Sequence, residues 1–147
     1  MKAIDQVTVV FTSRSANEGF ARSCAACFAA QLDPTLDEVA DIKTAVSEAV
    51  TNAIVHAYPD RLGQITMRLR LYDGGVLDIQ VKDAGVGIPD VDQARAPLFT
   101  TGGEERSGMG FTIMESFMDS LKVRSQLGKG TTVTMRKRIA RRAGAPR

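Results

Sequence analysis

The sequence predicts an α+β two-layer sandwich in which helices cover one face of a mixed, mostly antiparallel sheet. Three observations support this prediction. Residues 65–71 and 77–81 alternate apolar and polar side chains on either side of an Asp-Gly-Gly turn, which is typical of a β-hairpin. Two stretches with helical spacing precede this hairpin, and a third follows it. A central hairpin in such a chain favours helices packed on one side of an antiparallel sheet.

The part of the chain before the hairpin is expected to hold one strand and two helices. Residues 7–11 are apolar and mostly β-branched, as in a strand. A first helix is predicted over residues 16–31, and a second, longer one ends before Pro59. Each helix is preceded by the spacing of a capping box, in which a hydroxyl and a carboxylate satisfy free backbone N–H groups. The two boxes are Ser15 with Glu18 and Thr35 with Glu38.

The part after the hairpin begins with an irregular stretch. Residues 83–110 contain six glycines and little periodicity, and a loop of this length in a compact domain is usually functional. Helical spacing resumes from Phe111 to Leu121. Two strands, residues 123–126 and 131–138, then flank a Gly-Lys-Gly turn.

Charge is distributed unevenly along the chain. Its 19 Lys and Arg against 17 Asp and Glu give a formal net charge of +2, but six of the cations follow residue 135. Residues 1–135 therefore carry a net charge of −4, which argues against a basic groove, and we expect no direct DNA binding. We expect residues 1–139 to form one domain and the basic residues 140–147 to be a disordered tail.

Several other classes of protein are disfavoured. No apolar run approaches the roughly 18 residues of a membrane span and no signal region is recognisable, so we expect a cytoplasmic location and no membrane partner. Cys24 and Cys27 form a C-x-x-C pair in the first predicted helix, but one His in the whole chain leaves a four-ligand zinc site incomplete. We expect both cysteines to be small buried hydrophobic residues. The apolar positions at helical spacing there are Phe20, Cys24, Cys27, Phe28 and Leu32.

Polar residues line one stripe of the long predicted helix. Glu48, Asn52 and His56 recur every four residues, and their apolar neighbours place them near the buried face. Taken alone, a Glu and Asn pair is also compatible with a solvated helix edge. We expect His56 to be structural.

Asp83, Gly85 and Gly87 form a D-x-G-x-G motif directly after a predicted strand. A carboxylate at the end of a strand can accept an amino proton from a base, and glycine permits close backbone approach to a ligand. Such a motif alone is equally typical of a turn.

The sequence Arg-Ser-Gly-Met-Gly at residues 106–110 precedes a helix, where glycine N–H groups and the helix dipole can bind a phosphate. Its spacing matches neither the Rossmann nor the P-loop motif. Gly130 and Thr131 follow in what could be a simple hairpin turn.

Four motifs thus follow one another along the chain: the helix with Glu48 and Asn52, the D-x-G-x-G motif, residues 106–110, and Gly130 with Thr131. In this order, they resemble the Bergerat ATP-binding fold of the GHKL superfamily, shared by gyrase, the Hsp90 chaperones, histidine kinases and MutL. A narrower resemblance, from about residue 7 to residue 139, is to the anti-sigma-F factors of spore-forming bacteria, which are serine-protein kinases. The lid tip departs from that family by being shorter and richer in glycine. The stretches that carry the resemblance are residues 17–22, 31–34, 46–54, 97–101 and 106–115.

The resemblance implies binding of ATP or ADP with Mg²⁺ and transfer of phosphate to serine. In the matching positions, Asn52 would be the ligand of Mg²⁺ and Glu48 the base that orients or deprotonates the serine. Asp83 would accept from the adenine amino group, supported by Thr131, and Arg106 would stabilise charge at the γ-phosphate. The other implied nucleotide contacts are Gly85, Gly87, Thr100, Thr101, Ser107, Gly108, Met109 and Gly110, with residues 100–107 as a lid.

The resemblance also implies the partners. These are a sigma factor of the sigma-F type, an anti-anti-sigma factor that is phosphorylated on serine, and a second copy of the chain. Glu18 and Arg22 match positions that the family uses for partner contacts; without the resemblance they would be a capping Glu and a solvated Arg.

Two alternatives stay open. The chain could be a nucleotide-gated module that binds a sigma factor with little or no kinase activity, although Glu48 favours the kinase because a pure binder needs no base. It could also serve a related stress-response pathway. A histidine kinase or an ATPase clamp is disfavoured because 147 residues leave no room for dimerisation helices or transducer domains.

Overall fold

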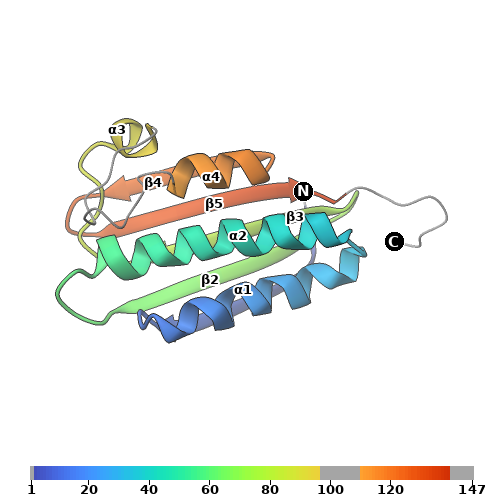
Figure 1. The fold of residues 1–147 in the computed structure, drawn as a ribbon, viewed down its shortest axis with the longest axis horizontal. Helices are drawn as coiled ribbons and strands as arrows, with labels where there is room; N and C mark the ends of the chain where they lie inside the picture. Colours follow the sequence, from blue (N-terminus) through green and yellow to red (C-terminus); the bar gives the residue numbers. More distant parts are fainter. Residues whose placement is uncertain (1, 97–109, 140–147) are drawn as a thin grey trace.

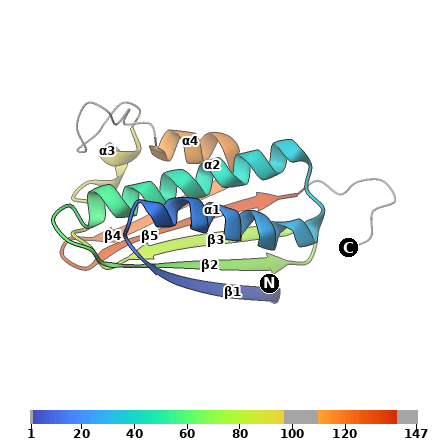
Figure 2. The ribbon, with the colours of Figure 1, turned by 60° about the horizontal axis from the view of Figure 1, so that its bottom comes forward.

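Five strands form one sheet in the order β1-β2-β3-β5-β4, and three of the helices, α1, α2 and α4, pack on one face of it (Figures 1 and 2). The structure is a computed structural model, and it describes residues 2–96 and 110–139. The predicted α+β sandwich is confirmed, and all pairings between the described strands are antiparallel. The strands are β1 (Ala3–Thr12), β2 (Gln64–Tyr72), β3 (Val76–Asp83), β4 (Ser120–Gln126) and β5 (Gly130–Arg138).

Four α-helices and two shorter helical segments complete the described chain. The α-helices are α1 (Ala16–Ala29), α2 (Leu36–Asn52), α3 (Val91–Arg95) and α4 (Gly110–Phe117). A 3₁₀ turn, η1 (Ala30–Leu32), follows α1, and a π-helical segment, η2 (Ala53–Ala57), continues α2. None of these helices combines the length and hydropathy needed to cross a membrane.

The core lies between the sheet and the helices. Alternate residues of the β2–β3 hairpin point inward, as the sequence pattern predicts, and are fully or almost fully buried. Burying one such aliphatic side chain contributes about 1.5–3 kcal/mol, so this layer stabilises the fold and fixes the position of α2 above the sheet. The main contributors are Ile65, Met67, Leu69, Leu71, Leu77, Ile79 and Val81 from the hairpin and Ile42, Val46 and Val50 from α2.

The two predicted capping boxes have different outcomes. Thr35 forms its box: its Oγ1 accepts from the Glu38 N–H at 3.1 Å, and the Glu38 carboxylate accepts from the Thr35 N–H at 2.8 Å. The box at Ser15 is wrong, because Ser15 already has helical dihedral angles and its side chain makes no capping bond. Glu18 instead points along the helix and pairs with Arg22 at 2.8 Å.

The burial predicted for the first helix is only partly right: Leu32 is buried and Phe28 packs against the core, but Phe20 and Cys27 are exposed. Ala21, Ala25 and Ala29 form its buried face, whereas Phe20 is 52% exposed. Cys24 is half-buried and Cys27 is exposed, both as free thiols. The small alanines let α1 approach its neighbours closely, and the larger side chains are displaced to the side and the surface.

The boundaries of other elements differ from the predictions in ways that follow from local pairing. β1 begins at Ala3 because it pairs with β2 along its length, and Leu121 belongs to β4, which pairs with β5, rather than to the preceding helix. The stretch predicted to be irregular contains the short helix α3, whose first turn is capped by Asp90. Residues 140–147, the predicted tail, lie outside the described part.

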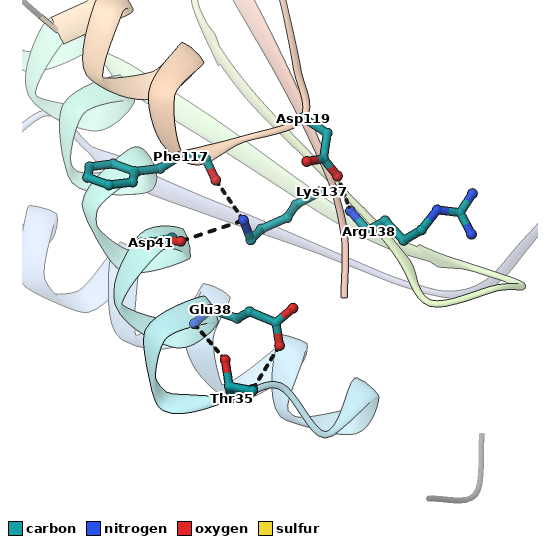
Figure 3. A network of polar contacts seen from close by, with 7 residues as sticks. All are labelled: Thr35, Glu38, Asp41, Phe117, Asp119, Lys137 and Arg138. Carbon is teal, nitrogen blue, oxygen red and sulfur yellow. Dashed lines mark hydrogen bonds and ion pairs between the residues drawn. The ribbon is translucent and has the colours of Figure 1, made fainter. Parts of the chain in front are cut away.

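A polar network joins β5 to the helical layer (Figure 3). Lys137 donates to the Phe117 carbonyl at the end of α4 at 2.8 Å and lies 3.7 Å from the Asp41 carboxylate on α2. A cation at a helix C-terminus is favourable because of the helix dipole. On the following residue, the Arg138 N–H donates to the Asp119 carboxylate at 2.7 Å. These contacts fix the C-terminal end of α4 over α2.

Candidate functional site

The last turns of α2, the end of β3, the start of β5 and the start of α4 meet at one end of the sandwich, on the left in Figure 1. These elements carry Glu48, Asn52, Asp83, Thr131 and Gly110, which are far apart in the sequence. The structure therefore brings together all four of the motifs that the sequence analysis singled out, as far as their residues lie within the described part.

Glu48 and Asn52 project from the last two turns of α2 toward the first residue of α4. A Cβ at Gly110 would lie 3.3 Å from both Oδ1 and Nδ2 of Asn52 and 3.4 Å from Oε2 of Glu48. The backbone of α4 thus begins against this carboxylate and this amide. Among the described residues, none forms a hydrogen bond with the side-chain amide of Asn52.

The π-helical segment Ala53–Ala57 follows Asn52 directly. Single π-helical turns are frequent at functional sites because they alter the direction of the side chains around them. Here the segment ends at Ala57, whose carbonyl accepts from the Val86 N–H of the D-x-G-x-G loop at 3.0 Å. His56 lies within the segment and is partly buried.

Asp83 ends β3 and is buried, with 8% of its surface exposed. Its Oδ1 accepts from the Gly85 N–H at 3.0 Å and from the Thr131 N–H at 3.1 Å. Burial raises the pKa of this carboxyl above its ordinary value, and the two backbone hydrogen bonds oppose that rise. No described residue donates to Oδ2, so the carboxylate keeps one acceptor for a ligand.

Glycine is required at three positions around Asp83, and at one of them, Gly87, φ is +80° and a Cβ would lie 2.5 Å from the Gln126 carbonyl oxygen. A Cβ at Gly85 would lie 2.2 Å from the Ala57 carbonyl oxygen, which no side chain tolerates. A Cβ at Gly130 would lie 2.2 Å from the Asp83 carbonyl oxygen, and φ at Gly130 is +121°. These close approaches hold the loop that follows Asp83 between the π-helical segment after α2 and the β4–β5 turn.

Thr131 is buried beside Asp83, and its hydroxyl meets a second hydroxyl that the sequence analysis missed. Ser125 Oγ lies 2.8 Å from Thr131 Oγ1, and it also accepts from the Ile88 N–H at 2.7 Å. Ser125 could have been found by pairing the two strands across the predicted Gly-Lys-Gly turn, since the two residues are direct cross-strand partners.

Tyr58 is a further residue that no motif indicated. Its hydroxyl donates to the Gln64 carbonyl and accepts from the Ala84 N–H, both at 2.7 Å. Gly63 lies directly beneath the ring, where any Cβ would clash with it. Tyr58 therefore ties the first residue after Asp83 to the start of β2.

Several predicted site residues lie outside the described part of the chain, together with most of the expected lid. They are Thr100, Thr101, Arg106, Ser107, Gly108 and Met109. Within residues 2–96 and 110–139, no cluster of three or more His, Cys, Asp or Glu could hold a metal ion by itself.

The family model and the curated relatives that match this chain point to the same family. Residues 11–137 match the family model of the histidine kinase-like ATPase domain. The chain is 56% identical over 142 residues to the anti-sigma F factor of Caldanaerobacter subterraneus subsp. tengcongensis, covering 96% of this chain and 99% of the relative. It is 54% identical over 138 residues to the anti-sigma F factor of Geobacillus kaustophilus, covering 93% and 94%.

Solved structures share the fold at lower identity. The RsbU and RsbW domains of a Mycobacterium tuberculosis protein superpose with a TM-score of 0.68 at 20% identity, covering 93% of this chain and 32% of that one. The histidine kinase domain of a blue-light activated kinase from Erythrobacter litoralis gives a TM-score of 0.58 at 24% identity, covering 83% and 61%.

Proposed function

The chain belongs to the anti-sigma F factors within the histidine kinase-like ATPase family, and on this premise we propose that it inhibits a sigma factor and phosphorylates an anti-anti-sigma factor on serine with ATP. The observation that carries the proposal is the convergence of the Glu48 and Asn52 side chains with the start of α4 at Gly110. In phosphoryl transfer a carboxylate can orient the attacking hydroxyl, an amide oxygen can hold the metal ion that neutralises phosphate charge, and a helix start can bind a phosphate.

The base of the nucleotide is assigned to the Asp83 pocket. Adenine carries an exocyclic amino group, and Oδ2 of Asp83, to which no described residue donates, is the proposed acceptor for it. Because Oδ1 is held by the N–H groups of Gly85 and Thr131, the orientation of the carboxylate is fixed before the ligand binds. Gly85 and Gly87 are proposed to line the base, and their lack of side chains lets the loop pack against the backbone of Ala57 and Gln126.

The phosphates are assigned to the other half of the site. The first residue of α4 would offer its N–H at a positive helix end, and Gly108, Ser107, Met109, Thr100 and Thr101 are proposed to contribute from the neighbouring lid. The Asn52 amide oxygen is a hard, neutral donor of the kind that Mg²⁺ takes in proteins, and it fits that ion as one of six oxygen ligands. When bound, Mg²⁺ neutralises charge on the phosphates.

Glu48 is the proposed base of the transfer step. The hydroxyl oxygen of the acceptor serine attacks the γ-phosphorus of ATP, its proton passes to the Glu48 carboxylate, and the bond from the γ-phosphorus to the bridging oxygen breaks to release ADP. Arg106 is proposed to stabilise charge on the transferred group.

Glu18 and Arg22 are the proposed partner contacts on α1. Arg22 donates twice to the Glu18 carboxylate, at 2.8 and 2.9 Å, so its guanidinium is held in one orientation on the helix surface. An Arg that is already ordered loses little entropy on binding and is a typical anchor of protein interfaces.

The proposed homodimer is supported by the edge strand. β1 is the first strand of the sheet, so one of its edges has no pairing partner within the described chain. Four of the nine large hydrophobic residues exposed in the described part lie on β1 or α1, namely Ile4, Val7, Val10 and Phe20. Exposed apolar side chains along a free edge favour association with a second copy.

The test of the kinase is transfer from γ-labelled ATP to a candidate anti-anti-sigma protein, followed by detection of phosphoserine. The matched control is the same partner with its acceptor serine replaced by alanine. Labelled phosphoserine in the first partner and none in the second is the expected result. Stable capture of a sigma factor with nucleotide bound but no labelled partner would leave the binding module as the function and overturn the kinase.

A further inference from the structure

Ser125 lies where β4, the start of β5 and the loop after Asp83 meet, at the proposed base site, which is called the base pocket below. Its Oγ accepts from the Ile88 N–H at 2.7 Å, at the end of the D-x-G-x-G loop. The same atom lies 2.8 Å from the hydroxyl of Thr131 and 3.2 Å from the carbonyl oxygen of Gly130, both at the start of β5. One hydroxyl on β4 thus contacts the two segments that flank Asp83.

The single proton of Ser125 has two possible acceptors. A hydroxyl donor is best matched by an oxygen about 2.7–2.8 Å away, and hydrogen bonds beyond about 3.0 Å are weak for this pair of atoms. The Thr131 hydroxyl meets this condition, and the Gly130 carbonyl, at 3.2 Å, does not. The geometry therefore favours donation from Ser125 to Thr131.

The proton of Thr131 is then left for a ligand. No described residue other than Ser125 lies within hydrogen-bonding distance of the Thr131 hydroxyl, and Thr131 is buried beside Asp83, with 8% of its surface exposed. If Ser125 donates to Thr131, the pocket presents an acceptor, Oδ2 of Asp83, next to a donor, the hydroxyl of Thr131.

We propose that Ser125 is a positioning residue for base recognition, which directs the Thr131 proton toward N1 of adenine, directly or through one water molecule. This inference rests on the proposed nucleotide site. Adenine presents a donor, its amino group, next to an acceptor, N1. That order matches the pair formed by Asp83 and Thr131, and guanine presents the reverse order on the same edge.

The experiment compares ATP with 1-deaza-ATP, in which a C–H group replaces the N1 acceptor. Binding of both nucleotides is measured by calorimetry for the full chain and for Ser125→Ala, with Ser120→Ala, an exposed residue of the same strand, as the control. A neutral hydrogen bond corresponds to a preference of roughly threefold to tenfold, which we expect the wild-type chain and Ser120→Ala to show for ATP.

For Ser125→Ala we expect the ATP affinity to fall by about threefold, because the Thr131 hydroxyl can then turn among three staggered positions. The affinity for 1-deaza-ATP should stay unchanged. In a Thr131→Val background, Ser125→Ala should have no further effect on ATP. Ser125→Thr, which keeps the hydroxyl, should restore the preference for ATP.

The outcomes separate this inference from the proposed function. A wild-type chain that binds neither nucleotide would overturn the nucleotide site itself. A wild-type chain that prefers ATP, with Ser125→Ala weakening both nucleotides equally, would overturn the role of Ser125 alone, since a purely structural role predicts equal losses. If Ser125→Ala does not fold, Ser125→Cys replaces it, because a thiol is close in size to the hydroxyl and is a weaker donor. Its affinities for ATP and 1-deaza-ATP are then compared in the same way.

Discussion

Gly110 lies directly against the side chain of Asn52: a Cβ at Gly110 would be 3.3 Å from both polar atoms of the Asn52 amide. This contact joins the start of α4 to the last turn of α2. It places the backbone of one helix beside the side chain that is proposed to reach the metal and the phosphates. Because residue 110 has no side chain, the space beside the Asn52 amide is not filled by a Cβ, and we assign this space to the proposed ligand.

Gly110→Ala should weaken ATP binding without unfolding the chain. The added methyl group would press on the Asn52 amide and displace its oxygen, and we expect a loss of roughly tenfold in affinity, equivalent to about 1.4 kcal/mol. Stability should not fall, because alanine is the better helix former. Calorimetric titration with MgATP and thermal unfolding measure the two quantities separately, and a variant that binds ATP normally would contradict the assignment of this space to the ligand.

Glu48→Gln should abolish serine phosphorylation while ATP binding survives. Glutamine has nearly the same shape as glutamate and cannot take the serine proton, so loss of the base should lower the transfer rate by roughly 10²–10⁴-fold. The rate is measured with γ-labelled ATP and the partner protein, and the affinity by titration. Transfer at the wild-type rate would show that Glu48 is not the base.

The sequence predicts the architecture well because its strongest signals are local. The alternation in residues 65–71 and 77–81 and the box at Thr35 arise within single elements, and the structure confirms them. The failed box at Ser15 shows the limit of that reasoning. A carboxylate three residues after a hydroxyl is also four residues before Arg22, and here the ion pair is formed instead.

Residues of the candidate site could be predicted where one segment of the sequence carries a whole motif. They could not be predicted where the role of a residue depends on contact between two distant segments. Asp83 and Gly85 are two residues apart in the sequence, so their motif can be recognised without knowledge of the fold. Ser125 and Tyr58 act through partners 37 and 26 residues away, at Ile88 and Ala84, and their roles depend on the register of the sheet. The burial of alanines rather than Phe20 on α1 likewise depends on how closely the helix packs, which helical spacing does not encode.

Gly85→Ala should destabilise the fold, because its Cβ would lie 2.2 Å from the backbone oxygen of Ala57 and neither group can move freely. Overpacking of this kind costs about 1–3 kcal/mol. The matched control is Gly19→Ala on α1, where the nearest atom to the new Cβ is 3.9 Å away, at the end of Arg22. That variant should gain about 0.5–1 kcal/mol, and urea denaturation of both should show changes of opposite sign.

Asp83 should make apo stability and nucleotide affinity respond to pH in opposite directions. Its folded-state pKa is raised by burial, so between the unfolded pKa and the raised value the folded state binds the extra proton. The contribution of Asp83 to stability is therefore present at low pH and is lost as pH rises through the raised pKa. ATP affinity should increase with pH over the same window, since the ionised carboxylate is the stronger acceptor for an amino group.

Asp83→Asn isolates this effect. The asparagine oxygen can still accept from the N–H groups of Gly85 and Thr131, but its amide nitrogen would face the adenine amino group as a second donor. We expect the variant to lose measurable ATP binding and to lack the decline in stability described above. The difference in denaturation midpoint between wild type and variant, followed with pH, is the measurement, and a difference that does not depend on pH would contradict a raised pKa.

Arg22→Ala should weaken capture of the sigma factor and leave nucleotide affinity unchanged. Removal of the guanidinium deletes a preordered cation from the surface of α1 and leaves Glu18 without its partner, while the base pocket and the Glu48–Asn52 stripe are built from other elements. Truncation of an anchoring Arg at an interface costs about 2 kcal/mol or more, so the dissociation constant for the sigma factor should rise by at least about thirtyfold. The ion pair between Arg22 and Glu18 lies at the surface, with 43% of the Arg22 side chain exposed, so it contributes little to stability and thermal unfolding should change only slightly. Arg124→Ala, an exposed arginine on β4, is the control for a general loss of positive charge, and it should bind the sigma factor as wild type does. Equal weakening by both variants would assign the effect to long-range charge and remove Arg22 from the interface.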